Sequence, residues 1–272
     1  MLARLKYSST LKFRQVYNWL FSDQCYLCLQ TLNPTEHEAS DQKTRGFAEG
    51  VVEGFSKGLL TNMPTSGRPT SGLCPDCTSA LPFLETACPR CAEPNHHGQT
   101  CGHCLKEPPS FQGIVTPFTY EFPINHLIKQ WKLRQQIKHG WILTVLAQQL
   151  GHLRFDVIVP VPSHWRRKIQ RGRDQSLEIA QHLSKHLNCP VEQALSRTKA
   201  TTTQRGLDKR QRRQNLKGAF ALTRNVKGMN ILLVDDVVTT GSTVELAAKT
   251  LQQGKPKSVT VACLAKTPTK RK

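Results

Sequence analysis

The sequence predicts an α/β protein in which a parallel sheet carries helices on both faces and follows a small cysteine-rich module. Two observations support this prediction. In the second half of the chain, short apolar runs rich in β-branched residues alternate with amphipathic helical segments, which is typical of parallel sheets. In the first 110 residues, eight of the ten cysteines stand in Cys-x-x-Cys pairs, which is typical of a metal-binding module.

Length and charge divide the chain at the same place. Its 272 residues are enough for one large or two modest domains, and we expect domains at 1–110 and 111–272. The first holds ten basic and ten acidic residues, and the second holds 28 basic and nine acidic, so the net charge of +19 belongs to the second. Such an excess attracts polyanions, namely nucleic acid or phosphorylated small molecules.

The four Cys-x-x-Cys pairs can build two metal sites. Each Cys-x-x-Cys turn points two thiolates at one ion, and two turns complete the tetrahedral site that structural zinc prefers. Chain order suggests that the first pair joins the second and the third joins the fourth, although spacing leaves a crossed arrangement open. Four thiolates leave no position for water, so we expect structural zinc. The candidate ligands are Cys25, Cys28, Cys74, Cys77, Cys88, Cys91, Cys101 and Cys104.

Disulfides, a redox pair and an iron–sulfur cluster are the alternatives to zinc. The amino terminus lacks the apolar core and cleavage site of a secretory signal, and no apolar run reaches the ~18 residues of a membrane span. We therefore expect a cytoplasmic protein without a membrane span, in which disulfides are rare. Residues 29–73 interrupt the cysteine module with a polar, turn-rich stretch that we expect to be a largely disordered insertion.

The elements of the second domain follow from their patterns. Residues 155–161 (FDVIVPV) are apolar and β-branched, which predicts a buried strand. Apolar residues at helical spacing predict a helix over 175–187. Residues 230–235 (NILLVD) predict a second strand, 243–253 a second helix, and 258–264 (SVTVACL) a third strand.

The segment 231–243, ILLVDDVVTTGST, carries the predicted ligand chemistry. Asp235 and Asp236 follow a central strand at its carboxyl end, where open α/β sheets bind ligands. They can accept hydrogen bonds from ribose hydroxyls or help to hold Mg²⁺. The following loop begins a helix whose unpaired N–H groups favour an anion, so we expect it to bind a phosphate. The loop residues are Val238, Thr239, Thr240, Gly241, Ser242 and Thr243.

This segment resembles the 5-phosphoribosyl 1-pyrophosphate (PRPP) motif of type I phosphoribosyltransferases at all thirteen positions. A double zinc ribbon followed by such a domain is similar to the ComF family of competence-associated proteins. Val159-Pro160-Val161-Pro162 matches that family's first strand, whereas Arg173-Asp174 departs from its Arg-Gly-Phe-Asn-Gln motif. The resemblance implies a type I phosphoribosyltransferase-like parallel sheet after a zinc-ribbon module, with Mg²⁺ and PRPP as ligands. Asp235 and Asp236 would be the catalytic pair.

Two clusters of cations stand near this motif in the sequence. One spans 164–173 with five Lys or Arg, and the other spans 197–217 with eight. The resemblance places the first near the pyrophosphate and the second on a loop that closes over the site. Such an excess of cations also suits the backbone of single-stranded nucleic acid, while a solvated basic surface is the third alternative. The candidate contact residues are Arg166, Arg167, Lys168, Arg171, Arg197, Gln204, Arg212 and Asn215.

These observations give three functional hypotheses. The first is a ComF-like protein that binds a phosphoribosyl ligand and handles internalised single-stranded DNA in natural competence, with a competence helicase or recombination-mediator protein as its partner. The second is an active Mg²⁺-dependent phosphoribosyltransferase of nucleotide salvage, whose acceptor the sequence does not identify. The third is a DNA-binding adaptor whose ligand site is vestigial.

Overall fold

The computed structural model describes residues 25, 27, 28, 30, 73–134, 140–163, 173–198 and 218–269. Its described residues up to Leu81 belong to one compact unit, and those from Pro82 belong to a second. The cysteines of 88–104 therefore share a unit with the sheet. The division at residue 110 stays a prediction, and the insertion at 29–73 lies outside the described residues apart from positions 30 and 73.

The first unit contains the short helix α2 (Pro75–Ser79). Cys74 is its N-cap, and Pro75 occupies the first helical turn, where its missing N–H costs nothing. The backbone N–H of Cys77 donates to Sγ of Cys74 across 3.4 Å. This helix start thus fixes the turn of one Cys-x-x-Cys pair.

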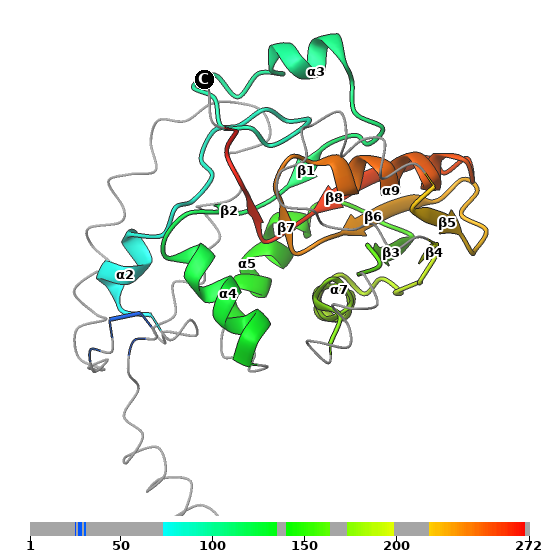
Figure 1. Ribbon diagram of the computed structural model, residues 1–272. Helices are drawn as coiled ribbons and strands as arrows, with labels where there is room; N and C mark the ends of the chain where they lie inside the picture. The colour runs from blue at the N-terminus through cyan, green and yellow to red at the C-terminus, as the bar shows by residue number, and fades with distance from the viewer. Residues whose placement is uncertain are drawn as a thin grey trace, which may run out of the picture. The chain divides into compact units, whose positions relative to one another are not determined.

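The second unit is built on a parallel sheet, as expected (Figure 1). Four strands lie in the order β1 (Ile114–Val115), β8 (Ser258–Ala262), β6 (Asn230–Val234) and β3 (Val157–Pro160). All three neighbouring pairs are parallel. The three strands predicted from the sequence are β3, β6 and β8, and β6 lies between the other two.

Three of these chain segments continue beyond a break into a second, shorter sheet. Its strands are β2 (Phe118–Thr119), β9 (Ala265–Lys266) and β7 (Val237–Val238), again parallel. The break between β6 and β7 consists of the two aspartates. The sequence analysis ended the strand at the acids and did not anticipate β7.

Helices cover both faces of the sheet, which confirms the predicted fold class. Helix α7 (Gln175–Leu187) contacts β3 and β6, and α5 (Gly140–Leu150) contacts α7 and β1. Helix α9 (Ser242–Gln252) contacts β8 and lies on the opposite side (Figure 1). Helix α4 (Ile124–Arg134) precedes α5, and the short α3 (Gly102–Lys106) carries Cys104.

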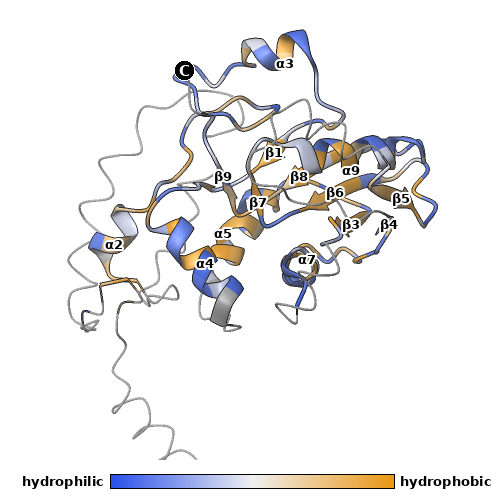
Figure 2. Ribbon diagram, viewed as in Figure 1, coloured by the Kyte–Doolittle hydropathy of each residue, from blue (hydrophilic) through white to orange (hydrophobic). Residues whose placement is uncertain are grey.

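Alternate residues of the strands form the core beneath α9, because side chains of a strand point to opposite faces in turn. Val157 and Val159 of β3 and Ile231 and Leu233 of β6 belong to this core, together with Val244 of α9. The strands are accordingly apolar, whereas α9 is polar on its outer side (Figure 2). Burial on both faces explains why these strands read as continuous apolar runs.

An antiparallel pair of strands, β4 (Leu195–Arg197) and β5 (Phe220–Leu222), packs against α9. The sequence analysis did not predict it, because each strand has only three residues. Residues 199–217, which hold most of the second cation cluster, connect the two strands and lie outside the described part of the chain. Among the described residues, no helix is long and apolar enough to cross a bilayer.

Candidate functional site

The two aspartates lie in the break between the two sheets. The backbone N–H of Asp235 donates to Ala262 across 3.0 Å, and the carbonyl of Asp236 accepts from Leu264 across 3.0 Å. Both backbones are therefore held by the neighbouring strand, while both side chains are only partly buried. This places two fixed carboxylates at the end of the central strand, next to the start of α9.

Each carboxylate has a different partner. Oδ1 of Asp235 accepts from the Ser176 hydroxyl across 3.1 Å and from the Asp236 N–H across 2.9 Å. Oδ2 of Asp236 lies 2.5 Å from Nζ of Lys132, a residue of α4, and both side chains are about four-fifths buried. Ser176 and Lys132 were not predicted as site residues, because they reach the acids from α7 and α4, which are distant from them in sequence.

The surroundings of Asp235 disfavour its ionised form. Burial and the negative charge of Asp236 raise the pKa of Asp235 from 3.8 to about 7, against the hydrogen bonds and Lys132, which lower it. Burial and Asp236 also raise the pKa of Tyr120, which follows β2. Carboxylates at this site can therefore accept hydrogen bonds from ligand hydroxyls, with Lys132 offsetting part of their charge.

The loop after the acids leads into α9 through Gly241. This residue is the N-cap of the helix and has a φ of 76°, a left-handed conformation that glycine adopts without strain. The Thr240 and Ser242 hydroxyls lie 3.0 Å apart on the exposed side of the turn. The backbone N–H groups of the first helical turn and these hydroxyls are donors that suit a phosphate, although the Ser242 N–H also makes a long contact of 3.5 Å to the Thr240 hydroxyl.

Val238 differs from the other loop residues. It belongs to β7, its side chain is 2% exposed, and its carbonyl accepts from the N–H of Thr267. Its side chain therefore packs in the core, while Thr239 and Thr240 are exposed. The exposed part of the candidate phosphate loop begins at Thr239.

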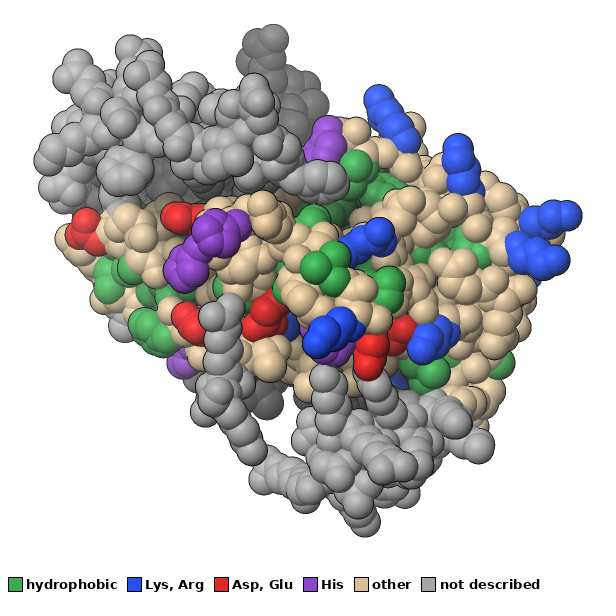
Figure 3. All heavy atoms as spheres, turned by 90° about the horizontal axis from the view of Figure 1, so that it is seen from above, with side chains coloured by type: hydrophobic (Ala, Val, Ile, Leu, Met, Phe, Trp, Pro, Cys, Tyr) green, Lys and Arg blue, Asp and Glu red, His purple; other side chains and the backbone are tan. Residues whose placement is uncertain are grey.

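Most of the candidate contact residues for pyrophosphate or nucleic acid lie outside the described residues. These are Arg166, Arg167, Lys168, Arg171, Gln204, Arg212 and Asn215. Arg197 is described, and its guanidinium lies over the Phe220 ring, 5.5 Å from the centroid, within range of a cation–π interaction. On the face seen in Figure 3, the described Lys and Arg side chains stand singly or in small groups, with acidic side chains among them.

The departure at Arg173-Asp174 has a local structural role. Asp174 is the N-cap residue of α7 and accepts a hydrogen bond from the Ser163 hydroxyl across 3.0 Å. Arg173 forms an exposed ion pair with Glu178 across 3.4 Å. The two residues thus fix the start of the helix that presents Ser176 to Asp235.

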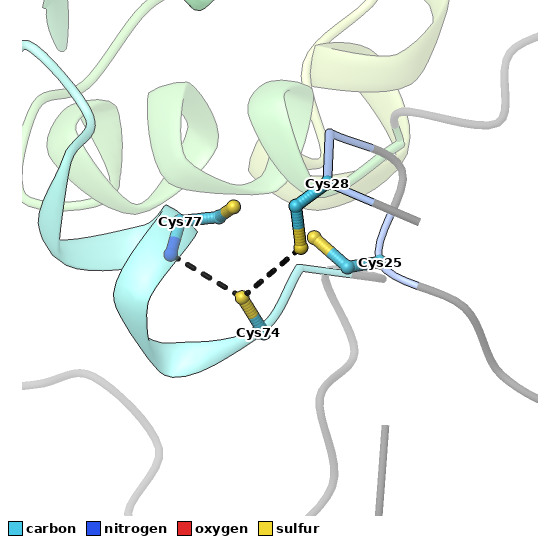
Figure 4. A group of neighbouring side chains, drawn as sticks. All are labelled: Cys25, Cys28, Cys74 and Cys77. Carbon is cyan, nitrogen blue, oxygen red and sulfur yellow. Dashed lines mark hydrogen bonds between the residues drawn. The ribbon is translucent and has the colours of Figure 1, made fainter. Parts of the chain in front are cut away.

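The eight paired cysteines form two groups of four, in the grouping that chain order suggested. Within each group, the four Sγ atoms lie within 4.8 Å of one another. In the first group the sulfurs of Cys25, Cys28, Cys74 and Cys77 converge on one point (Figure 4). Four converging thiols match the donor set of structural zinc, so both groups can hold the ion.

The acidity of these thiols supports a cation site. Burial raises the pKa of Cys88, but the backbone N–H groups around it outweigh this effect and lower the pKa to about 7. The pKa of Cys91 is raised to about 12, chiefly by burial and also by the charge of Cys88. One thiol of the group therefore ionises readily, whereas ionisation of its neighbours is opposed by burial and by the charge of the first thiolate. A bound cation would offset these adjacent negative charges.

The second group is joined closely to the sheet. Residues 86–95 form a hairpin in which Cys88 donates its N–H to the Glu93 carbonyl across 2.9 Å. Ala92 belongs to the core beneath α9, and a Cβ on Gly113 would lie 2.5 Å from the Pro89 carbonyl oxygen. The cysteine hairpin therefore packs as part of the unit that carries the two acids.

Part of the second unit matches a known domain family. The phosphoribosyl transferase domain family matches residues 173–272. Among solved structures, the purine phosphoribosyltransferase of Pyrococcus horikoshii is similar over 47% of this chain and 71% of its own, with 22% identity and a TM-score of 0.33.

Curated relatives match most of the chain. DNA utilization protein YhgH of Escherichia coli (strain K12) is 39% identical over 206 residues, which are 72% of this chain and 91% of the relative. Competence protein F of Haemophilus influenzae is 35% identical over 67% of this chain and 85% of its own length. Competence protein ComFC of Bacillus subtilis is 24% identical over 71% of this chain and 83% of its own length. The chain therefore belongs to the ComF family, the family of competence protein F and the DNA utilization protein YhgH.

Proposed function

We propose that this chain binds a phosphoribosyl ligand of the PRPP type at the two aspartates and the phosphate loop, and that it takes part in the handling of single-stranded DNA. One observation carries the ligand: two fixed carboxylates at the end of β6 lead within a few residues into the start of α9. Hydroxyl acceptors beside phosphate donors suit a ribose phosphate.

The parts of this ligand have separate places in the proposal. The loop from Thr239 takes the monophosphate, and Asp235 with Asp236 takes the ribose hydroxyls. Mg²⁺ arrives with the pyrophosphate, which the cations of 164–173 contact. Lys132 contacts only Oδ2 of Asp236, so that carboxylate keeps lone pairs that can accept a ligand hydroxyl while the ion pair stays closed.

The DNA part rests on charge and on the relatives. The names of the relatives refer to DNA utilization and to competence. The net charge of +19 lies wholly in residues 111–272, as nucleic-acid binding requires. The cations of 164–173 and 197–217 supply the phosphate contacts, and competence proteins that deliver or load DNA are the expected partners in the cytoplasm.

Salt dependence tests DNA binding directly. Labelled single-stranded DNA is titrated with the zinc-loaded full chain at several KCl concentrations. Six phosphate contacts predict a slope of log K against log salt of about −4. Arg166→Gln and Arg212→Gln should each reduce the slope by about 0.7, whereas Lys249→Gln on the far end of α9 should not. A slope near zero for the wild type would reject the DNA part.

Catalysis of phosphoribosyl transfer is the second candidate function, and the domain match over residues 173–272 favours it. Cations around a departing pyrophosphate would stabilise its charge, and a closing loop would exclude water. The test is PRPP-dependent release of pyrophosphate with a panel of bases and amines. Release that requires one acceptor would support an enzyme, and binding of PRPP without release would support a ligand-binding role alone.

A further inference from the structure

A buried lysine lies directly behind the phosphate loop. Lys266 is on β9, and its side chain is 5% exposed. Its Nζ donates to the carbonyl oxygens of Thr239 across 3.0 Å and Thr267 across 2.6 Å, and it lies 3.2 Å from Oε2 of Glu93. An ammonium group has three N–H donors, so these three acceptors match its full capacity.

The contact to Thr239 fixes the entry of the phosphate loop. Thr239 is the first exposed residue after β7, and its carbonyl is held by the Lys266 side chain. Val238, one residue earlier, is the ladder partner of Lys266. One residue of β9 therefore sets both the strand before the loop and the first peptide of the loop itself.

The acid that holds this lysine belongs to the second cysteine group. Glu93 lies on the return strand of the Cys88/Cys91 hairpin, where its carbonyl accepts from Cys88. Its carboxylate pairs with Lys266 and also accepts from the N–H of Thr269 across 2.7 Å and from the hydroxyl of Thr269 across 2.9 Å. Within the described part of the chain, the donors to this carboxylate come from the segment that follows β8.

We propose that Glu93 and Lys266 are positioning residues that connect the second four-cysteine group to the phosphate loop, so that affinity for a phosphate monoester depends on their ion pair. The inference rests on the proposed phosphoribosyl ligand and adds residues of β9 and the cysteine hairpin to its site. Removing one partner of a buried ion pair leaves the other charge uncompensated. In this case it also releases the carbonyl that shapes the loop.

Two parts of the ligand can be tested separately. Ribose 5-phosphate reports on the loop, because its only phosphate is the one that the loop should hold. Pyrophosphate reports on the cation cluster of 164–173, where the proposed function places it, and not on the loop that begins at Thr239. Substitution of a residue that positions the loop should weaken binding of ribose 5-phosphate and leave binding of pyrophosphate unchanged. A substitution that destabilises the whole fold should weaken binding of both ligands.

The experiment is calorimetry of the zinc-loaded full chain with ribose 5-phosphate and, separately, with Mg·pyrophosphate. Lys266→Met should weaken ribose 5-phosphate binding by about tenfold or more and change pyrophosphate binding by less than about twofold. Glu93→Gln should cause a smaller loss with the same selectivity. The double variant should lose less binding free energy for ribose 5-phosphate than the sum of the losses in the two single variants, because the two residues act as one pair. Lys249→Met, which removes an exposed ion pair on α9, is the matched control and should change neither affinity.

Each outcome bears on one of the two proposals. Equal affinity of the wild type, Lys266→Met and Glu93→Gln for ribose 5-phosphate would overturn the positioning role and leave the ligand site intact. A parallel loss for both ligands would also overturn it, in favour of a structural role. If Lys266→Met does not fold, Glu93→Gln alone decides, because it keeps an oxygen acceptor for Lys266 and Thr269. A wild type that binds neither ribose 5-phosphate nor PRPP would reject the proposed function itself.

Discussion

Asp235 should destabilise the fold when it is ionised, and this cost can be measured. Its pKa is raised from 3.8 to about 7, chiefly by burial and then by the charge of Asp236. A group whose pKa is raised in the folded state favours folding less as its proton is lost. At 1.36 kcal/mol per pKa unit, the change corresponds to about 4 kcal/mol at most, reached above about pH 7.

Asp235→Asn removes the charge and keeps an oxygen that can accept from Ser176 and from the Asp236 N–H. The variant should therefore be more stable than the wild type, and its advantage should grow by about 2 kcal/mol between about pH 5.5 and pH 7.5. The measurement is the free energy of unfolding in urea for both zinc-loaded proteins across this range, taken as a difference so that other titrating groups cancel.

Asp236→Asn is the matched control for this prediction. It removes the partner of Lys132 and only the smaller of the two causes that raise the pKa of Asp235, so its gain in stability should be smaller than that of Asp235→Asn. A difference between Asp235→Asn and the wild type that stays constant with pH would refute the reasoning. An Asp235→Asn variant that is less stable than the wild type at every pH would also refute it, because ionised Asp235 would then carry no measurable cost in folding free energy.

Three further predictions concern the two four-cysteine groups, Gly241 and Lys132. Cys88→Ser should lower the zinc content of the purified chain from two ions to one, while Cys263→Ser should leave it unchanged; an unchanged content in Cys88→Ser would contradict the zinc assignment. Gly241→Ala meets no atom within 4 Å, so its cost of about 1–2 kcal/mol should come from the left-handed backbone alone, and its melting temperature and ribose 5-phosphate affinity should both fall. Lys132→Met should move the pH transition of Asp235 upward, since Lys132 lowers that pKa; an unchanged transition in the unfolding curves would reject the coupling.

The sequence predicted the central part of the fold because its signals are local. The runs around Val159 and Leu233 are buried on both faces and therefore read as strands without reference to the rest of the chain. The turn from the two acids into α9 was equally readable, since Gly241 and its neighbouring hydroxyls follow the acids directly. The grouping of the cysteines also followed chain order.

What the sequence did not reveal depends on tertiary structure. Lys132 and Ser176 reach the acids from helices that are distant in sequence, and Lys266 meets Glu93 across 173 positions. Nothing in the local pattern of these four residues distinguishes them from ordinary surface or helix residues. The two-residue strands such as β7 were missed because they are too short to show alternation.

The central claim is that a phosphoribosyl ligand binds where β6 meets α9. Its most direct test is calorimetric titration of Mg·PRPP into the zinc-loaded full chain and into the Asp235→Asn/Asp236→Asn double variant. We expect one saturable site per wild-type chain and loss of binding in a double variant that remains folded. Undetectable binding to the wild type, or undiminished binding to the folded double variant, would contradict it.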